Sequence, residues 1–289
     1  MAKTALILGG GGALGISWET GVLAGLKQAG VDVTGADLVV GTSAGSVVAT
    51  QITQGWSLEE LLEEHRNGTI GTNTPMDFDL PNMMNVFAKW AAYDDIDQER
   101  CAEIGKMAIA SKTTTEEKWI ESFSDFINPD WPADRDLRIC TDDAETGEFV
   151  TWTRDSGVPM RTAVASSCAV PAMFPCVRIN GRLYQDGGVR SGTSADVAAG
   201  YDSTLIIAPI GARNDSIDPL LGRITRREAD ELRAGGSNVE LVFPDAAALE
   251  AMGFNRMDST RRGVSADAGV KQGVALARKL EAAWSKTPA

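Results

Sequence analysis

The sequence predicts an α/β fold, in which helices cover a mostly parallel sheet. Short apolar runs rich in β-branched residues alternate along the chain with longer segments of helical periodicity. A glycine-rich turn directly follows each of the first two apolar runs, at residues 9–15 and 41–45. Strand–turn–helix units of this kind connect parallel strands, because a parallel pair needs a long crossover between its members.

Eight of the apolar runs have the length and composition of buried strands. The dipeptide Asn180-Gly181 separates two of them, and this hairpin signal predicts that the two pair antiparallel. The predicted strands are residues 4–8, 37–40, 137–141, 149–152, 177–179, 182–185, 203–209 and 239–243.

The predicted helices carry end signals that place their boundaries. Gly30 ends the first helix, and Ser57 with Glu60 forms a capping box at the start of another. Residues 67–81 are polar, contain two prolines and are predicted to form a loop. The predicted helices are residues 16–29, 47–52, 57–66, 82–93, 98–110, 114–126, 160–168, 225–234 and 266–284.

The composition indicates a globular protein with an acidic surface. Its 289 residues include 40 Asp and Glu against 27 Lys and Arg, a formal net charge of −13. This charge argues against nucleic acid as a partner and against steady adsorption on anionic membranes. Transient contact with lipid through apolar residues stays open. No apolar run has the length of a signal-peptide core or a membrane helix, so we expect a cytoplasmic protein.

The chain offers few metal ligands. None of its four cysteines forms a C-x-x-C pair, and His65 is the only histidine. Zinc sites need such residues in clusters, so we expect no metal site and mostly buried free thiols. The cysteines are Cys101, Cys140, Cys168 and Cys176.

A serine between two glycines stands at a sharp strand-to-helix turn. The sequence Gly41-Thr42-Ser43-Ala44-Gly45 follows the apolar run 37–40 and precedes the apolar helix 47–52. In a nucleophile elbow the same context lifts the serine hydroxyl above the sheet, at the positive end of a helix. Ser43 is therefore the candidate nucleophile. The alternative is a Gly/Ser-rich turn without chemistry.

The first glycine-rich loop allows two interpretations. Gly10-x-Gly12-x-x-Gly15 fits a dinucleotide-binding fingerprint, but the second strand supplies no carboxylate for a ribose. The other interpretation is an oxyanion hole, because successive glycine N–H groups beside a helix N-terminus bind anions. The amide of Ala44, next after the candidate nucleophile, would complete that hole. Nucleotide binding through this loop stays open as the alternative.

A serine hydroxyl needs a base to become a good nucleophile. The usual α/β hydrolases place an aspartate and then a histidine after the serine, whereas here no histidine follows His65. The charged neighbours of His65 predict a solvated helix face rather than a catalytic one. Asp186 ends a predicted strand and precedes Gly187 and Gly188, so a Ser–Asp dyad is the simpler arrangement. An Asx-type turn is the alternative reading of these residues.

Together these residues resemble the three motifs of the patatin-like phospholipase family. The motifs are Gly10-Gly11-Gly12-Ala13-Leu14-Gly15, Gly41-Thr42-Ser43-Ala44-Gly45 and Asp186-Gly187-Gly188, in the family's order and spacing. Residues 165–175 are similar to the family's segment before the aspartate. The resemblance spans about residues 4–210, and we expect one domain over residues 1–289 with a C-terminal part from 211 to 289.

The resemblance implies a three-layer α/β/α sandwich and a lipid acyl hydrolase that uses neither metal nor other cofactor. Ser43 would be the nucleophile and Asp186 the base, and the substrate would be a lipid or fatty-acyl ester. The oxyanion amides would come from Gly10, Gly11 and Gly12. The remaining motif glycines are Gly15, Gly41, Gly45, Gly187 and Gly188.

Two positions depart from the family pattern. Leu14 stands where the family usually has arginine or lysine, which removes a positive charge near the oxyanion hole. Arg190-Ser191-Gly192 stands where asparagine and proline often follow the third motif. A catalytically inactive relative that binds lipid is therefore a further alternative. Five residues form a stripe at helical spacing, which either packs in the core or lines a site for an acyl chain: Met83, Met84, Phe87, Trp90 and Ala91.

Overall fold

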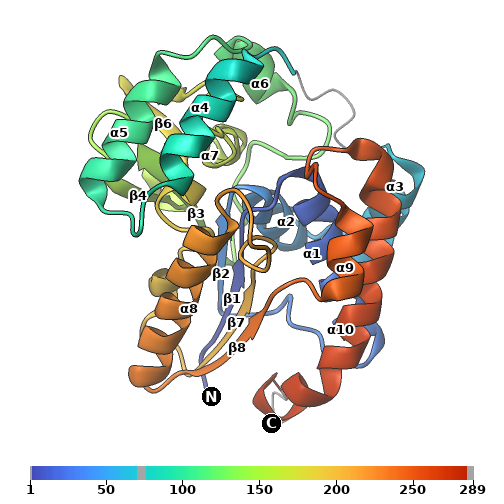
Figure 1. Cartoon of the computed structure of the whole chain (residues 1–289). Coiled ribbons are helices and arrows are strands. Elements are labelled where there is room, and N and C mark those ends of the chain that lie inside the picture. The colour runs from blue at the N-terminus through green and yellow to red at the C-terminus, as the bar shows by residue number, and fades with distance from the viewer. Residues whose placement is uncertain (1, 70–75, 285–289) are drawn as a thin grey trace.

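The computed structural model describes residues 2–69 and 76–284. Among these residues, eight strands form a single sheet, which lies between layers of helices (Figure 1). The strands are β1 (Thr4–Leu8), β2 (Leu38–Thr42), β3 (Asp136–Asp143), β4 (Phe149–Trp152), β5 (Val177–Ile179), β6 (Arg182–Asp186), β7 (Ser203–Ile207) and β8 (Asn238–Val242).

Five neighbouring strands are parallel, in the order β3-β2-β1-β7-β8. At the β3 side of the sheet, β4 and β6 pair antiparallel with β3, and β5 pairs antiparallel with β6. The mostly parallel α/β fold is confirmed, and so is the hairpin through Asn180-Gly181, which joins β5 and β6.

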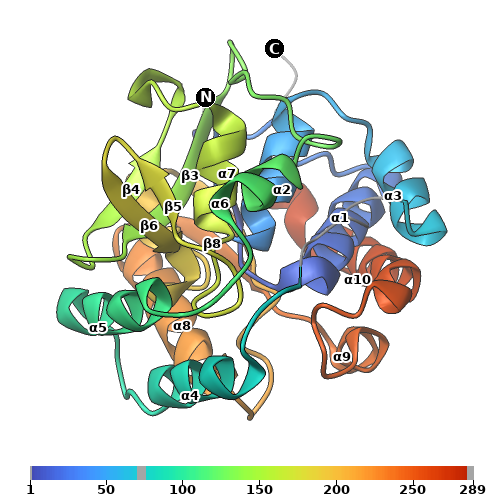
Figure 2. The ribbon, with the colours of Figure 1, turned by 90° about the horizontal axis from the view of Figure 1, so that it is seen from above.

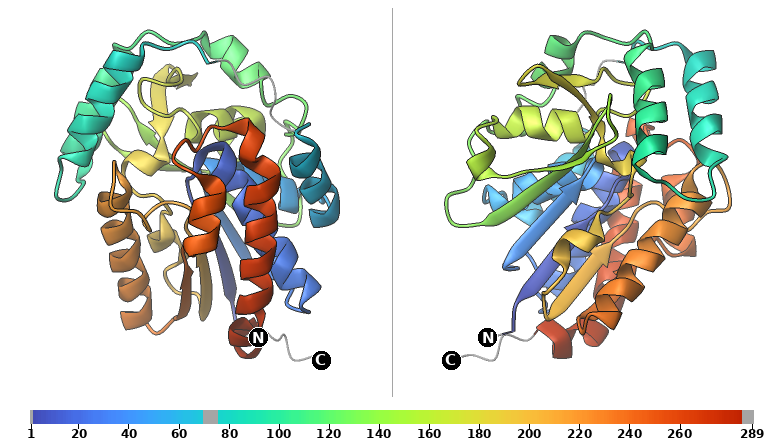
Figure 3. Two further views of the ribbon diagram at one scale, coloured as in Figure 1. Left: turned by 45° about the vertical axis from the view of Figure 1, so that its right-hand side comes forward. Right: turned by 90° about the vertical axis from the view of Figure 1, so that its left-hand side faces the viewer.

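The two faces of the sheet carry different helices (Figure 3). Successive side chains of a strand point to opposite faces, so Leu6 and Leu8 join one core cluster while Ala5 and Ile7 join another. The first cluster includes residues of α1 (Gly12–Gln28), α2 (Ala44–Thr53) and α7 (Met160–Ser167). The second includes residues of α8 (Asp218–Ala234) and the short 3₁₀ helix η3 (Ala195–Ala198). Both faces are thus covered, which is the three-layer arrangement.

Further helices build on the first layer. α10 (Arg262–Trp284) lies along α1, and α3 (Leu58–Asn67) packs against both. A Cβ atom at Gly21 would lie 2.1 Å from the Ala266 carbonyl oxygen, so only glycine allows this close approach of α1 and α10. α9 (Ala246–Met252) packs against α10. None of the described helices is both long and apolar enough to cross a membrane.

Two helices form a cap over one end of the sheet. Figure 2 shows α4 (Leu80–Ala91) and α5 (Gln98–Ile109) beside α8, on the side away from α1. Val86 and Trp90 of α4 join a third core cluster with Leu221 and Ile224 of α8. Residues 113–127 turn back from this cap toward α7, with one short helix, α6 (Glu116–Glu121). The cap therefore places the stripe of α4 near the carboxyl ends of the parallel strands.

Several predicted boundaries were wrong. α1 begins at Gly12 and not at residue 16, and α8 begins at Asp218 and not at 225, because tertiary packing stabilises turns of low intrinsic propensity. Of the helix predicted at 114–126, only Glu116–Glu121 is α-helical, and α9 was not predicted. Within the predicted loop 67–81, residues 70–75 lie outside the described residues, and α4 already begins at Leu80.

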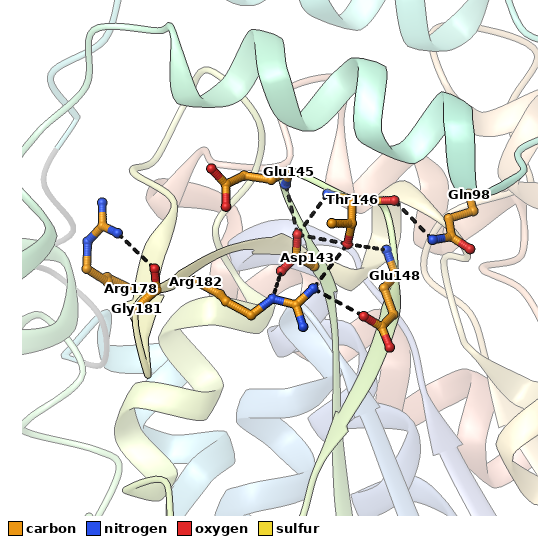
Figure 4. Close-up of polar contacts among 8 residues, drawn as sticks. All are labelled: Gln98, Asp143, Glu145, Thr146, Glu148, Arg178, Gly181 and Arg182. Carbon is orange, nitrogen blue, oxygen red and sulfur yellow. Dashed lines mark hydrogen bonds and ion pairs between the residues drawn. The ribbon is translucent and has the colours of Figure 1, made fainter.

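The turn between β3 and β4 holds the antiparallel side of the sheet in register (Figure 4). Oδ1 of Asp143 accepts hydrogen bonds from the Thr146 amide at 2.8 Å and from its hydroxyl at 3.0 Å. Oδ2 of the same buried carboxylate forms an ion pair with Nε of Arg182 at 2.6 Å, and Arg182 also pairs with Glu148. Because Arg182 begins β6, these contacts fix the strand that ends at Asp186 against β3.

Candidate active site

The glycine loop and Ser43 meet because β1 and β2 are parallel neighbours. Leu8 pairs with Gly41, so the turns that follow the two strands lie side by side. The Gly45 amide donates to the Gly9 carbonyl at 2.9 Å. A Cβ atom at Gly45 would lie 2.0 Å from the Leu8 carbonyl oxygen, so this contact requires glycine.

Ser43 has a strained backbone that its neighbours hold in place. Its φ of 53° and ψ of −123° are rare for a residue with a side chain. The Ser43 amide donates to Oγ of Ser167 at 2.9 Å, and its carbonyl accepts from Oγ of Ser46 at 2.6 Å and from Sγ of Cys168 at 3.2 Å. Strain at this turn is the feature that aims a nucleophilic serine away from the sheet.

The register of β3 brings Asp186 to Ser43. Thr42, the last residue of β2, pairs with Cys140, and Asp186, the last residue of β6, pairs with Thr141. One edge of β3 pairs with β4, which covers both Cys140 and Thr141. β2 and β6 therefore both pair with the opposite edge of β3, where their carboxyl ends meet. Two residues that are far apart in the sequence therefore become neighbours.

Burial controls the charge of Asp186. The carboxyl group is almost fully buried, which raises its pKa from the ordinary 3.8 to about 7. Hydrogen bonding from the Ser43 side chain and from the Gly188 amide limits this rise. Oδ1 accepts the Gly188 amide at 2.7 Å, whereas Oδ2 has no partner with full hydrogen-bond geometry among the described residues. The Ser43 side chain therefore lies close enough to Asp186 to affect its pKa, and Oδ2 is the carboxylate oxygen without a hydrogen-bond partner among the described residues.

Three backbone amides at this site have no acceptor within the described part of the chain. They belong to Gly11, Gly12 and Ala44, which cap or begin the helices α1 and α2, where N–H groups lack intrahelical partners. The Gly10 amide, by contrast, donates to the Gly192 carbonyl at 2.8 Å. The expectation that Gly10 supplies an oxyanion amide is therefore corrected, because its N–H is already engaged.

The other motif glycines permit close backbone packing. At each of them, a Cβ atom would approach a neighbouring atom to 3.3 Å or less. The neighbours are Pro209 Cβ at 3.3 Å for Gly15, Ser46 Cα at 2.5 Å for Gly41, the Cys140 carbonyl oxygen at 2.6 Å for Gly187 and Asp186 Oδ1 at 2.8 Å for Gly188.

Ser43, Asp186 and the glycine loop line one cavity of about 300 Å³. Most of its remaining wall is apolar and comes from the cap, from the segment after α7 and from the segments around α8 and α9. These apolar residues are Met83, Phe87, Trp90, Val170, Met173, Ile210, Ile217, Leu221, Phe254 and Met257. Trp90 of the α4 stripe is buried in the cap core and also lines the cavity. Met84 belongs to neither, since it is 61% exposed, so its place in the predicted stripe was wrong.

An ion pair from the C-terminal part of the chain supports the glycine loop. Nη2 of Arg256 lies 2.8 and 2.9 Å from the two carboxylate oxygens of the fully buried Asp218. The Arg256 carbonyl accepts the Leu14 amide at 3.0 Å, in the first turn of α1. The Leu14 side chain is buried in the core and does not face the cavity. Arg256 lines the cavity beside Gly12 and brings a positively charged side chain to that wall.

His65 lies elsewhere, and its predicted solvated position was wrong. It is buried where α3 packs against α1 and α10, and its Nδ1 lies 3.1 Å from Oγ of Ser17. Burial, followed by the charge of Arg262, lowers the pKa of His65 to about 3. It does not line the Ser43 cavity, so a Ser–His pairing at that serine is not supported.

The residues that hydrogen-bond the backbone of Ser43 and of the glycine loop were not predicted from the sequence. Ser167 and Cys168 lie in the family-like stretch 165–175, which was their only signal. Glu19 is fully buried and accepts the Gly9 amide at 2.8 Å, and burial raises the pKa of this carboxyl. Neither Glu19 nor Arg256 lies in a recognisable sequence motif, so the sequence offered no signal for them. Within residues 2–69 and 76–284, no cluster of His, Cys, Asp and Glu could hold a metal ion.

Comparison with known proteins identifies the family. Residues 6–199 match the family model described as patatin-like phospholipase. The chain belongs to the patatin-like phospholipase family. Membership confirms the resemblance seen in the motifs and supports hydrolysis of lipid esters as the activity of this patatin-like chain.

Two solved structures resemble this chain at low sequence identity. VipD from Legionella pneumophila is 13% identical with a TM-score of 0.49, and the match covers 96% of this chain and 67% of VipD. The type III effector protein ExoU is 17% identical with a TM-score of 0.39, and the match covers 96% of this chain. This patatin-like chain spans only 53% of ExoU. No curated protein matched it in sequence.

Proposed function

We propose that this protein hydrolyses carboxylic esters of lipids through an acyl-enzyme formed on Ser43, with Asp186 as the base. The observation that carries the proposal is the common cavity that Ser43, Asp186 and the amides of Gly11 and Gly12 line. The apolar wall of that cavity suits an acyl chain, and its polar atoms lie where an ester carbonyl would react.

In the acylation step, Oγ of Ser43 attacks the ester carbonyl while its proton passes to Oδ2 of Asp186. A pKa of about 7 makes Asp186 a stronger base than an ordinary carboxylate, yet leaves it ionised in part near neutral pH. The negative oxygen of the tetrahedral intermediate accepts hydrogen bonds from the amides of Gly11, Gly12 and Ala44. One such donor typically contributes about 10²–10³ in rate.

Collapse of the intermediate breaks the ester C–O bond, and the leaving alkoxide takes the proton from Asp186. In deacylation, Asp186 accepts a proton from a water molecule that attacks the acyl carbonyl. The same amides stabilise the second oxyanion. The acid then leaves, and the proton on Asp186 returns to Oγ of Ser43, which restores the starting state.

We further propose that residues 1–289 act as one catalytic unit, although the family model matches only residues 6–199. β8 adds to the edge of the same sheet, and Phe254, Arg256 and Met257 line the cavity. Removal of the C-terminal part would therefore open the wall beside Gly12.

Labelling with a fluorophosphonate tests the activated serine. We expect a single adduct on Ser43 in the wild type and none in Ser43→Ala. Asp186→Asn should lower both the labelling rate and kcat/KM for a short-chain ester by about 10⁴, the loss that follows when asparagine replaces the triad aspartate of a serine protease. His65→Gln is the matched control and should be labelled at the wild-type rate.

Three results would contradict the proposal. Labelling that persists in Asp186→Asn but disappears in His65→Gln would make His65 the base. An unlabelled wild type that binds lipid but turns over no ester would support an inactive lipid-binding relative. Tight binding of NAD or ATP in calorimetry, abolished by substitution of Gly12, would support the nucleotide-binding alternative.

A further inference from the structure

The mouth of the Ser43 cavity is edged by large apolar side chains that face solvent. Phe254, on the segment after α9, lines the cavity and is nevertheless 88% exposed. On the other side, α4 contributes Met83 and Phe87 to the cavity wall, while its Leu80 and Met84 are 54% and 61% exposed. Figure 2 shows α4 and α9 along the same side of the molecule. We call Leu80, Met84 and Phe254 the apolar rim.

The apolar rim is unusual for this chain. Among the described residues, only seven large apolar side chains are exposed, and three of them form the rim. Leu80 and Met84 are four residues apart on α4, so they lie on one helix face. Among residues 2–69 and 76–284, Phe254 has one aromatic or cationic contact, with the guanidinium of Arg213, 5.4 Å from its ring centre. Exposed apolar side chains that gather beside one cavity, rather than being scattered singly, are typical of an interaction surface.

We infer that the apolar rim docks the protein on the surface of a zwitterionic lipid bilayer, from which an acyl ester enters the Ser43 cavity. This inference rests on the proposed function, because it assigns a lipid surface as the source of the substrate. A protein partner or a second copy seated on the rim would close the mouth of the cavity. A lipid surface would instead place acyl chains directly against Met83 and Phe87, without passage through water.

Charge decides which lipid surface fits. The chain has a formal net charge of −13, which opposes approach to anionic lipids. Insertion of apolar side chains between head groups depends on buried area and needs no net attraction between charges. We therefore expect binding to phosphatidylcholine vesicles that changes little between low and high salt.

The binding test uses the full chain with Ser43→Ala, so that no vesicle lipid can be hydrolysed. Partition into dioleoylphosphatidylcholine vesicles is measured by flotation. Leu80→Gln and Met84→Gln keep good helix formers on α4, and each should weaken partition by about tenfold. Phe254→Ser should weaken it by a similar factor. The matched control is Val274→Gln, which changes an exposed apolar residue on α10 away from the rim.

A second assay separates docking from chemistry. With Ser43 intact, Leu80→Gln/Met84→Gln should hydrolyse a monomeric short-chain nitrophenyl ester at the wild-type rate, because neither residue lines the cavity. The same variant should hydrolyse vesicular phosphatidylcholine at least tenfold more slowly. If the wild type turns over no ester at all, the proposed function fails, while the flotation result still decides the docking.

Three outcomes would overturn the inference. Equal partition of the rim variants and the wild type would remove the rim from the lipid contact. Binding only to anionic vesicles, lost in high salt, would make the contact electrostatic. A dimer in light scattering without lipid, which Leu80→Gln/Met84→Gln converts to a monomer, would assign the rim to a second copy of the chain.

Discussion

Replacement of Asp186 by asparagine should lower turnover by about 10⁴ and stabilise the protein at alkaline pH. The burial that would make Asp186 a base under the proposed function also makes its ionised form unfavourable in the folded state. Asparagine has nearly the same shape, can still accept the Gly188 amide, and carries no charge to bury. The variant therefore isolates the free energy that the folded protein loses by ionising this one group.

The magnitude follows from the two pKa values. The Asp186 carboxyl titrates at about 7 when folded, against an ordinary 3.8. Between pH 5 and 7 the unfolded state is ionised and the folded state is protonated, so the folded state binds the extra proton. Its contribution to stability is present below the lower pKa and is lost as pH rises through the higher one. Each pH unit removes about 1.4 kcal/mol, or about 3 kcal/mol over this range.

The assay is urea unfolding of the wild type and Asp186→Asn at pH 5 and pH 8.5. The difference in free energy of unfolding between the two proteins should shift by about 3 kcal/mol in favour of asparagine at the higher pH. Other buried carboxyl groups cancel, because both proteins contain them. Asp125→Asn, at an exposed site, is the control and should give the same difference at both pH values. A difference for Asp186→Asn that does not vary with pH would refute the reasoning.

Three other predictions follow from the same geometry. The value of kcat/KM for an uncharged ester should rise about tenfold per pH unit below pH 7 and level off above it, and a flat profile would exclude Asp186 as the base. Because the pKa of His65 is lowered in the folded state, the unfolded state takes up a proton first as the pH falls below 6.5. The free energy of unfolding should therefore fall by about 2 kcal/mol between pH 6.5 and pH 5. Urea unfolding should show this contribution in the wild type and not in His65→Gln. Arg256→Met leaves the buried Asp218 carboxylate without its ion-pair partner and should lower the free energy of unfolding by about 3 kcal/mol. Adding Asp218→Asn should recover part of that loss, and no recovery would show that the ion pair is not its cause.

Features that depend on neighbouring residues could be predicted from the sequence. Apolar runs followed by glycines predicted the strand–turn–helix units, and the elbow at Ser43 follows from two glycines and one serine within five positions. Short-range sterics govern such turns, so a local pattern is sufficient to recognise them. The same holds for the hairpin at Asn180-Gly181 and for the α/β class of the fold.

The side chains and amides that surround Ser43 could be identified only in the folded chain. Asp186 reaches Ser43 because β2 and β6 end against each other on one edge of β3, and no local pattern encodes that register. The Gly10 amide is engaged by the distant carbonyl of Gly192, and His65 is buried by helices from both ends of the chain. Hydrogen bonds and burial depend on partners far away in sequence. For the same reason, the place of Arg256 on the cavity wall could be seen only in the folded chain.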